Sequence, residues 1–183
     1  FRAAIHASDA YDHQIQELAG HQPVDIYEAL IVADVRDACD VLRPAYDRTD
    51  GRDGFVSLEV SPYLARNASA SIAEARRFWQ AVARPNLLIK IPGTSEGVAA
   101  VEGLLSEGIN VNITLLFAVD RYEEVAGAYM SALERRKVAR EPLARVASVA
   151  SFFLSRIDTA VDEQLRQKIA SGVPQAERLL GKC

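Results

Sequence analysis

The chain has 183 residues, a formal net charge of −4 and 49% hydrophobic residues, an ordinary globular composition. This composition excludes a disordered chain, a fibre and a coiled coil, and the acidic balance argues against nucleic acid or an acidic membrane as partner. No apolar run approaches the roughly 20 residues of a membrane-spanning helix, and no signal peptide stands out at the N-terminus. Two cysteines, Cys39 and Cys183, are too few for a disulfide framework or a zinc cluster, so we expect a cytoplasmic location.

In chain order, the first 50 residues predict helices, one opening at Ser8 and one with a capping box formed by Asp25 and Glu28. A loop rich in turn-forming residues follows over 47–54. The hydrophobic period then changes, and four strand–helix units follow in series. The predicted strands are residues 55–60, 87–92, 109–117 and 146–154, and the predicted helices are residues 64–82, 94–108, 120–133 and 158–169. The third of these helices has a capping box of Asp120 and Glu123, and Thr94 caps the second.

Strands that alternate with helices indicate an α/β fold with a parallel sheet, so we expect four parallel strands in sequential order with helices outside. The strands are apolar with little alternation, which is typical of strands covered on both faces. A (β/α)8 barrel of about 250 residues uses roughly 31 residues per unit, so four units fit this chain. We interpret residues 1–183 as a single domain, with a helical lead-in over 1–50 and four units over 55–170.

Histidine and lysine are both scarce, which narrows the catalytic chemistry. All three histidines lie within the first 21 residues, away from every predicted strand, which argues against a Ser-His-Asp triad or a histidine metal site. Of the four lysines, three lie in polar, helix-like surroundings and only Lys90 lies in an apolar strand. Lys90 is either a strand-end lysine that extends to solvent or a Schiff-base lysine, whose neutral amine attacks a carbonyl carbon.

Other polar residues occupy the corresponding ends of the neighbouring predicted strands. Glu59 interrupts an apolar strand one unit earlier, and it either pairs with an arginine or moves protons for Lys90. Asn112 and Thr114 share one face of the next strand, where they are either satisfied polar residues or contacts for a substrate hydroxyl and a water. Ser151 and Arg156 flank the last strand-to-helix junction, which suits a phosphate or simply an exposed helix start.

Two of these segments together resemble the active-site sequences of the transaldolase family. Residues 88–97, Leu-Ile-Lys-Ile-Pro-Gly-Thr-Ser-Glu-Gly, are similar to its lysine signature, and residues 107–117 are similar to a second hallmark. Residues 56–60 and 148–153 fit in the same order, so the resemblance covers essentially the whole chain and is closest to the longer bacterial form. It implies a (β/α)8 TIM barrel of the class I aldolase type, incomplete here, with about four parallel strands and their helices.

The resemblance also implies an activity of the pentose phosphate pathway. A dihydroxyacetone unit passes from sedoheptulose 7-phosphate to glyceraldehyde 3-phosphate through a lysine Schiff base. By position, Lys90 forms the imine, and Glu59 and Thr114 hold the water that carries protons. The residues that the resemblance assigns to substrate binding are Asn112, Ser151, Phe153 and Arg156. It implies neither a metal nor a cofactor, because the protonated imine itself is the electron sink.

The sequence departs from the family pattern at two places. The acid–base aspartate of the family's first strand and a Thr-Asn-Pro-type segment of its second strand are absent from these 183 residues. We expect that two barrel strands precede and two follow the part of the barrel that the chain covers. We therefore expect the isolated chain to be nearly inactive as a transaldolase, and its open sheet edges to favour a homo-oligomer. The alternatives are another Schiff-base aldolase acting on sugar phosphates, or a non-catalytic phosphosugar-binding fragment.

Overall fold

The computed structural model describes residue 5 and residues 7–182. Helices α2 (Asp12–Glu17) and α3 (Pro23–Arg48) precede a four-stranded sheet. The first unit of the sheet consists of β1 (Val56–Glu59), the short 3-10 helix η1 (Pro62–Leu64) and α4 (Ala68–Val82). The later elements are β2 (Leu87–Pro92), α5 (Ser95–Ser106), β3 (Val111–Leu116), α6 (Val119–Val138), β4 (Ser148–Phe152), α7 (Leu154–Ala170) and the 3-10 helix η2 (Pro174–Leu179).

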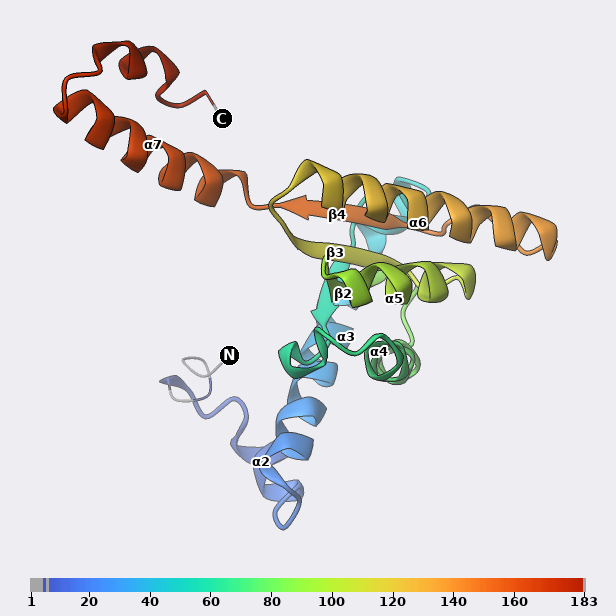
Figure 1. The fold of residues 1–183 in the computed structure, drawn as a ribbon. Coiled ribbons are helices and arrows are strands. Elements are labelled where there is room, and N and C mark those ends of the chain that lie inside the picture. The colour runs from blue at the N-terminus through green and yellow to red at the C-terminus, as the bar shows by residue number, and fades with distance from the viewer. Residues whose placement is uncertain (1–4, 6, 183) are drawn as a thin grey trace.

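The four strands are parallel and lie in the order β1-β2-β3-β4, which confirms the order that the sequence predicts. Helices α4, α5 and α6 lie side by side along one face of the sheet (Figure 1). The register pairs Glu59 with Lys90 and Lys90 with Asn112 on neighbouring strands. Since strand side chains alternate between the two faces, the residues next to these three point into the helix layer. The polar residues thus share the face away from the helices.

The core lies between the sheet and the helix layer. Strands β2 and β3 supply Ile89, Ile91, Val111 and Ile113, all essentially inaccessible to solvent. The largest buried side chains of α5 are Val101, Leu104 and Leu105, and α4 adds Phe78 and Val82. Each buried aliphatic side chain of this size contributes roughly 1.5–3 kcal/mol of hydrophobic stabilisation. This layer holds β1 to β3 in fixed register and so fixes the polar residues on the other face.

The sequence predicts caps at the N-termini of three helices, and the structure agrees with one of the three. Thr94 is the N-cap of α5, because its Oγ1 accepts a hydrogen bond from Gly97 N at 3.0 Å, which confirms that prediction. Both predicted capping boxes are wrong. Helix α3 begins at Pro23, two residues before Asp25, and α6 begins at Val119, one residue before Asp120, and neither N-cap side chain accepts a hydrogen bond. The two aspartates lie instead within the first helical turn, where the helix dipole favours a negative charge.

Strand β4 differs from the expectation that every strand is covered on both faces. Val149 and Ala150 are exposed. Only Phe153 separates β4 from α7, which begins at Leu154 rather than at Asp158 as predicted. Helix α7 extends away from the sheet, and η2 folds back along α7 (Figure 1). The helix that follows β4 therefore does not cover it in this structure.

Helix α3 is joined to the sheet by polar contacts at the start of β2. Asn86 Nδ2 donates to the carbonyl oxygens of Cys39 and Gly54, at 2.9 and 2.8 Å. The hydrogen-bonded Arg84 guanidinium holds the pKa of Asp40 below its ordinary value. Burial raises the pKa of the Cys39 thiol to about 11. Cys39 is therefore a protonated, buried part of this junction. Among the described residues, the helices include none that is long and apolar enough to cross a membrane.

Candidate functional site

Lys90 and Glu59 meet at the carboxyl ends of two neighbouring strands. Lys90 Nζ lies 3.3 Å from Glu59 Oε2, as their register on β2 and β1 requires. The lysine side chain is 28% exposed and the glutamate side chain 50% exposed. Lys90 is the only residue of β2 that is not fully buried, so the amine reaches the open face while the rest of the strand is anchored in the core. A primary amine beside a carboxylate at an accessible strand end can both attack a carbonyl carbon and exchange protons.

The residues after Lys90 fix the end of its strand. Gly93 N donates to Thr114 O at 2.7 Å, and Thr94 Oγ1 donates to Ala65 O at 2.6 Å, in addition to capping α5. A Cβ atom on Gly97 would overlap the carbonyl oxygen of Pro92, so only glycine lets α5 begin this close to the strand. Gly93, Thr94 and Gly97 in the segment after the lysine therefore each have a structural role. The segment holds the strand end against its neighbours on both sides.

Asn112 lies on β3 between two serines. Its Nδ2 donates to Ser57 Oγ of β1 at 3.1 Å, and its Oδ1 accepts from Ser151 Oγ of β4 at 2.7 Å. All three side chains are partly buried. Asn112 and Ser151 were expected from the sequence, whereas Ser57 was not. The two-residue period of a strand could have indicated Ser57, because it places Ser57 on the same face of β1 as Glu59.

Thr114 lies on the same strand but has a different environment. It is 1% exposed, and its carbonyl oxygen accepts the bond from Gly93. The ladder between β3 and β4 shifts register between Ile113 and Leu116, and Leu115 has a φ of 61°. This bulge gives β3 a local bend immediately after Thr114. No hydrogen bond joins the Thr114 side chain to Glu59 in the described part of the chain, so the water-holding pair expected from the sequence is not in direct contact.

An aromatic pair and an arginine lie beyond the ends of β3 and β4. The rings of Phe117 and Phe153 are stacked, with centroids 5.5 Å apart and planes 17° from parallel. The Arg156 guanidinium carbon lies 4.3 Å from the Phe153 ring centroid. The structure thus joins Phe153 to Arg156 but directs Ser151 to Asn112 instead. Phe117 was not expected from the sequence, because it is one more apolar residue at the end of a predicted strand.

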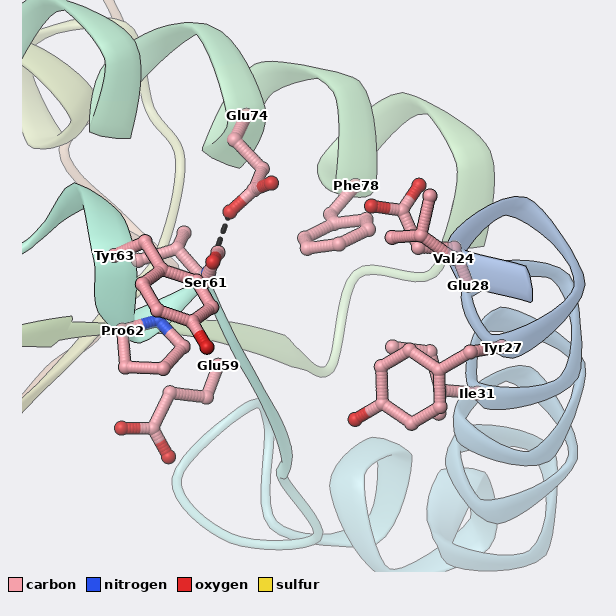
Figure 2. Close-up of a pocket in the computed structure, with 11 residues that line it drawn as sticks. Val24, Tyr27, Glu28, Ile31, Glu59, Ser61, Pro62, Tyr63, Glu74 and Phe78 are labelled. Atoms are coloured by element: carbon pink, nitrogen blue, oxygen red, sulfur yellow. Dashed lines mark hydrogen bonds between the residues drawn. The ribbon is translucent and has the colours of Figure 1, made fainter. Parts of the chain in front are cut away.

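A cavity of about 520 Å³ lies between α3, α4 and the end of β1. Its walls are mostly apolar, with Tyr27 and Ile31 of α3 on one side and Phe78 of α4 on the other (Figure 2). Glu74 Oε2 accepts a hydrogen bond from Ser61 N at 2.5 Å, and the Glu59 carboxylate points away from that bond. Glu59 lines the cavity, whereas Lys90 does not. The cavity therefore lies mainly at the junction of the two helices and meets the lysine site only at Glu59.

No group of three or more His, Cys, Asp or Glu side chains that could hold a metal ion is found within residues 5 and 7–182. The chemistry offered by the described residues is that of a lysine amine, a carboxylate, a clamped amide and an arginine.

Comparison with known proteins relates this geometry to a family. A model of the family described as "Transaldolase/Fructose-6-phosphate aldolase" matches residues 1–181. A protein of Parafrankia sp. strain EAN1pec named "Transaldolase" is 49% identical over 186 residues, which span 100% of this chain and 49% of that protein. Proteins of the same name are 52% identical in Acidothermus cellulolyticus, over 91% of this chain and 45% of the relative, and 50% identical in Thermobifida fusca, over 100% and 49%.

This chain spans about half the length of the curated relatives that it matches. Both the lysine segment and the asparagine segment lie inside the matched range. The match covers nearly every residue, and these relatives are 49 to 52% identical to the chain. The chain therefore belongs to the transaldolase/fructose-6-phosphate aldolase family, and its four parallel strands form part of that family's (β/α)8 barrel.

Proposed function

We propose that this chain carries the Schiff-base site of a transaldolase, which moves a dihydroxyacetone unit between sugar phosphates. The observation that carries the proposal is the 3.3 Å pairing of Lys90 Nζ with Glu59 Oε2 at the ends of neighbouring parallel strands. Barrel enzymes place their catalytic groups at these strand ends. The relatives named "Transaldolase", at 49 to 52% identity, support the same assignment.

In this proposal, the neutral Lys90 amine attacks the ketone carbon of sedoheptulose 7-phosphate, and loss of water leaves a protonated imine. The water that carries protons during these steps is held by Glu59 and Thr114. The imine draws the electrons of the breaking carbon–carbon bond while the adjacent hydroxyl of the sugar gives its proton to the acid–base aspartate, which the family resemblance places on a strand outside these residues. Erythrose 4-phosphate then leaves, and an enamine remains on Lys90. The enamine then attacks the carbonyl carbon of glyceraldehyde 3-phosphate. Hydrolysis of the new imine releases fructose 6-phosphate and the free lysine, without metal or cofactor.

We assign substrate binding to β3 and to the junction between β4 and α7. Asn112 hydrogen-bonds the three-carbon unit, since its amide lies next to Lys90 across the β2–β3 register. Ser151 and Arg156 bind the phosphate, with Phe153 beside them. Support for this assignment comes from the guanidinium of Arg156, which is placed over the Phe153 ring and keeps its edge donors available for a phosphate.

The test is reduction with borohydride in the presence of fructose 6-phosphate, followed by peptide mapping. We expect the sugar adduct at Lys90, because reduction makes an imine permanent. The Lys90→Arg variant keeps the positive charge but cannot form the imine, and it should remain unlabelled, while the matched Lys137→Arg variant on exposed α6 should label like the wild type. Labelling of Lys137, Lys168 or Lys182 with Lys90 untouched would reject the assignment.

Products separate this proposal from the other aldolase chemistry named in the family description. In a protein of the relatives' full length, a transaldolase forms fructose 6-phosphate from the two transaldolase substrates without releasing free dihydroxyacetone. The isolated 183 residues lack the acid–base aspartate, so we expect them to form almost none. Release of dihydroxyacetone from fructose 6-phosphate would instead identify an aldolase that uses the same imine. A chain that binds the sugar phosphates without any trapping at Lys90 would be the phosphosugar-binding module.

We further propose a cytoplasmic location and self-association through the sheet edges. The free, buried Cys39 thiol is compatible with a reducing compartment. Strands β1 and β4 are the edge strands of the described sheet, and unpaired edges favour association. Sedimentation of the purified chain measures the association, and a monomer at all concentrations would contradict it.

A further inference from the structure

The amide of Asn112 is held from both sides by serine hydroxyls that come from two other strands. Ser57 of β1 accepts from Asn112 Nδ2 at 3.1 Å, and Ser151 of β4 donates to Asn112 Oδ1 at 2.7 Å. The bond to Ser57 crosses β2, the strand that carries Lys90, because β1 and β3 are not adjacent. Three strands around the lysine are thereby joined through one side chain.

The remaining hydrogen-bonding capacity of Asn112 explains why this arrangement matters. A primary amide has two N–H donors and an oxygen that can accept two hydrogen bonds. Each serine uses one position, which leaves one N–H and one acceptor position for a ligand. Two bonds on opposite sides also fix the plane of the amide. A free asparagine side chain would have to lose that rotational freedom each time it bound a ligand.

Core packing does not account for a serine at position 57. The neighbouring Leu58 is buried in the helix layer, whereas Ser57 is half-buried on the opposite face. β-Branched and aromatic residues are favoured in strands, and serine adds little apolar contact there. Its hydroxyl accepts a hydrogen bond from the side chain of Asn112, which is 55 residues away in the sequence. The contact that position 57 provides is thus a polar one, directed to Asn112.

We propose that Ser57 is a positioning residue for Asn112, fixing the amide plane from the β1 side so that its free N–H faces the three-carbon unit bound at Lys90. This inference rests on the proposed function. Ser57 acts on the affinity for the sugar and leaves the imine-forming pair of Lys90 and Glu59 unchanged, since neither residue contacts the Ser57 hydroxyl by a hydrogen bond in the described structure.

The first measurement needs no ligand. Nuclear magnetic resonance of the wild-type chain, with the Asn112 side-chain amide identified by its loss in Asn112→Asp, gives the exchange rate of that amide with solvent. We expect Ser57→Ala to increase this rate about threefold to tenfold, which corresponds to the net free energy of one hydrogen bond. Ser57→Thr keeps a hydroxyl and should restore the slow rate. Ser106→Ala removes a comparable serine bond on α5, to Glu102 O at 2.7 Å, and should leave the rate unchanged.

The second measurement uses borohydride trapping at Lys90 with fructose 6-phosphate over a range of concentrations. Ser57→Ala should raise the half-saturating sugar concentration about threefold to tenfold and leave the maximal trapping rate nearly unchanged. A purely structural serine would lower thermal stability without moving the half-saturating concentration. In the Asn112→Ala background, Ser57→Ala should have no further effect, because its influence passes through the amide.

The two measurements separate the two possible failures. An unchanged Asn112 exchange rate in Ser57→Ala overturns the inference whatever the trapping shows. A faster exchange with an unchanged half-saturating concentration, in a wild type that is trapped normally, overturns it as well. A wild type that is never trapped contradicts the proposed function instead, and the exchange rate then still decides whether Ser57 positions Asn112.

Discussion

Gly97 is a residue that the backbone itself dictates. It lies in the first turn of α5, where a Cβ atom would overlap the Pro92 carbonyl oxygen. The helix can therefore begin directly against the end of β2, which carries Lys90. We expect Gly97→Ala to lower the free energy of unfolding by about 3 kcal/mol, because the helix and the strand end must move apart. Urea denaturation followed by circular dichroism measures this change.

Gly127 provides the matched control for that substitution. It lies within α6, and a Cβ atom there would meet no atom within 4 Å apart from its chain neighbours and the backbone of its own helix. Gly127→Ala should raise the free energy of unfolding by about 0.5–1 kcal/mol, since alanine loses less backbone entropy in a helix. If Gly97→Ala proved as harmless as Gly127→Ala, α5 would not be fixed against β2 as described.

At the scale of single residues, the sequence indicates a polar group best where it interrupts an apolar run. Lys90 and Glu59 stand out because burying either charge inside a strand is costly. Ser57 does not stand out, because a serine on a half-buried strand face costs little and its partner is 55 residues away. Phe117 does not stand out either, because an aromatic residue at the end of a strand is common. The functional roles of these residues remain predictions.

At the scale of elements, connection length decides where a helix begins. Only two residues separate β2 from α5, and Thr94 is the second of them, so the predicted cap is also the observed one. Two residues likewise separate β3 from α6, which places the helix start before Asp120. For α3, Pro23 starts the helix, because its fixed φ suits the first helical position. Capping patterns alone could not show these tertiary and backbone constraints.

Arg136 joins three elements near the end of α6. Its Nη1 donates to Ser106 O of α5 at 3.0 Å, and its Nε and Nη2 donate to Pro142 O in the loop before β4, at 3.0 and 2.7 Å. The residue is only 8% exposed. These carbonyls lie where α5 ends and where the chain turns toward β4. The guanidinium therefore supplies donors that the loop itself does not.

We expect Arg136→Ala to lower the free energy of unfolding by about 3 kcal/mol, because the carbonyl oxygens of Ser106 and Pro142 lose three charge-assisted hydrogen bonds from a buried side chain. The neighbouring Arg135→Ala is the control. Arg135 is 66% exposed and pairs with Glu102 at the surface, so its loss should cost less than about 1 kcal/mol. Equal effects of the two variants in urea denaturation would show that Arg136 acts only as a surface charge.

At the scale of the whole molecule, the alternation of strands and helices predicted the parallel sheet and its strand order, because each short crossover returns the chain to the next position. The position of α7 could not be predicted in the same way. An amphipathic pattern indicates that one face of a helix needs cover, but not which surface supplies it. In the structure, α7 packs mainly on η2, and Leu165 is its only buried residue.

This arrangement predicts a gradient of local stability along the chain. Helix α5 lies between α4 and α6 and is anchored in the core by Val101, Leu104 and Leu105, so its amides should exchange with solvent only on global unfolding. The amides of α7 should exchange through local opening and be at least about a hundredfold less protected, since little apolar surface is lost when α7 opens. Hydrogen exchange with mass spectrometry resolves the two helices, with α4 as an internal reference for the core. Protection of α7 equal to that of α5 would show instead that α7 packs against β4, as α5 packs against β2 and β3.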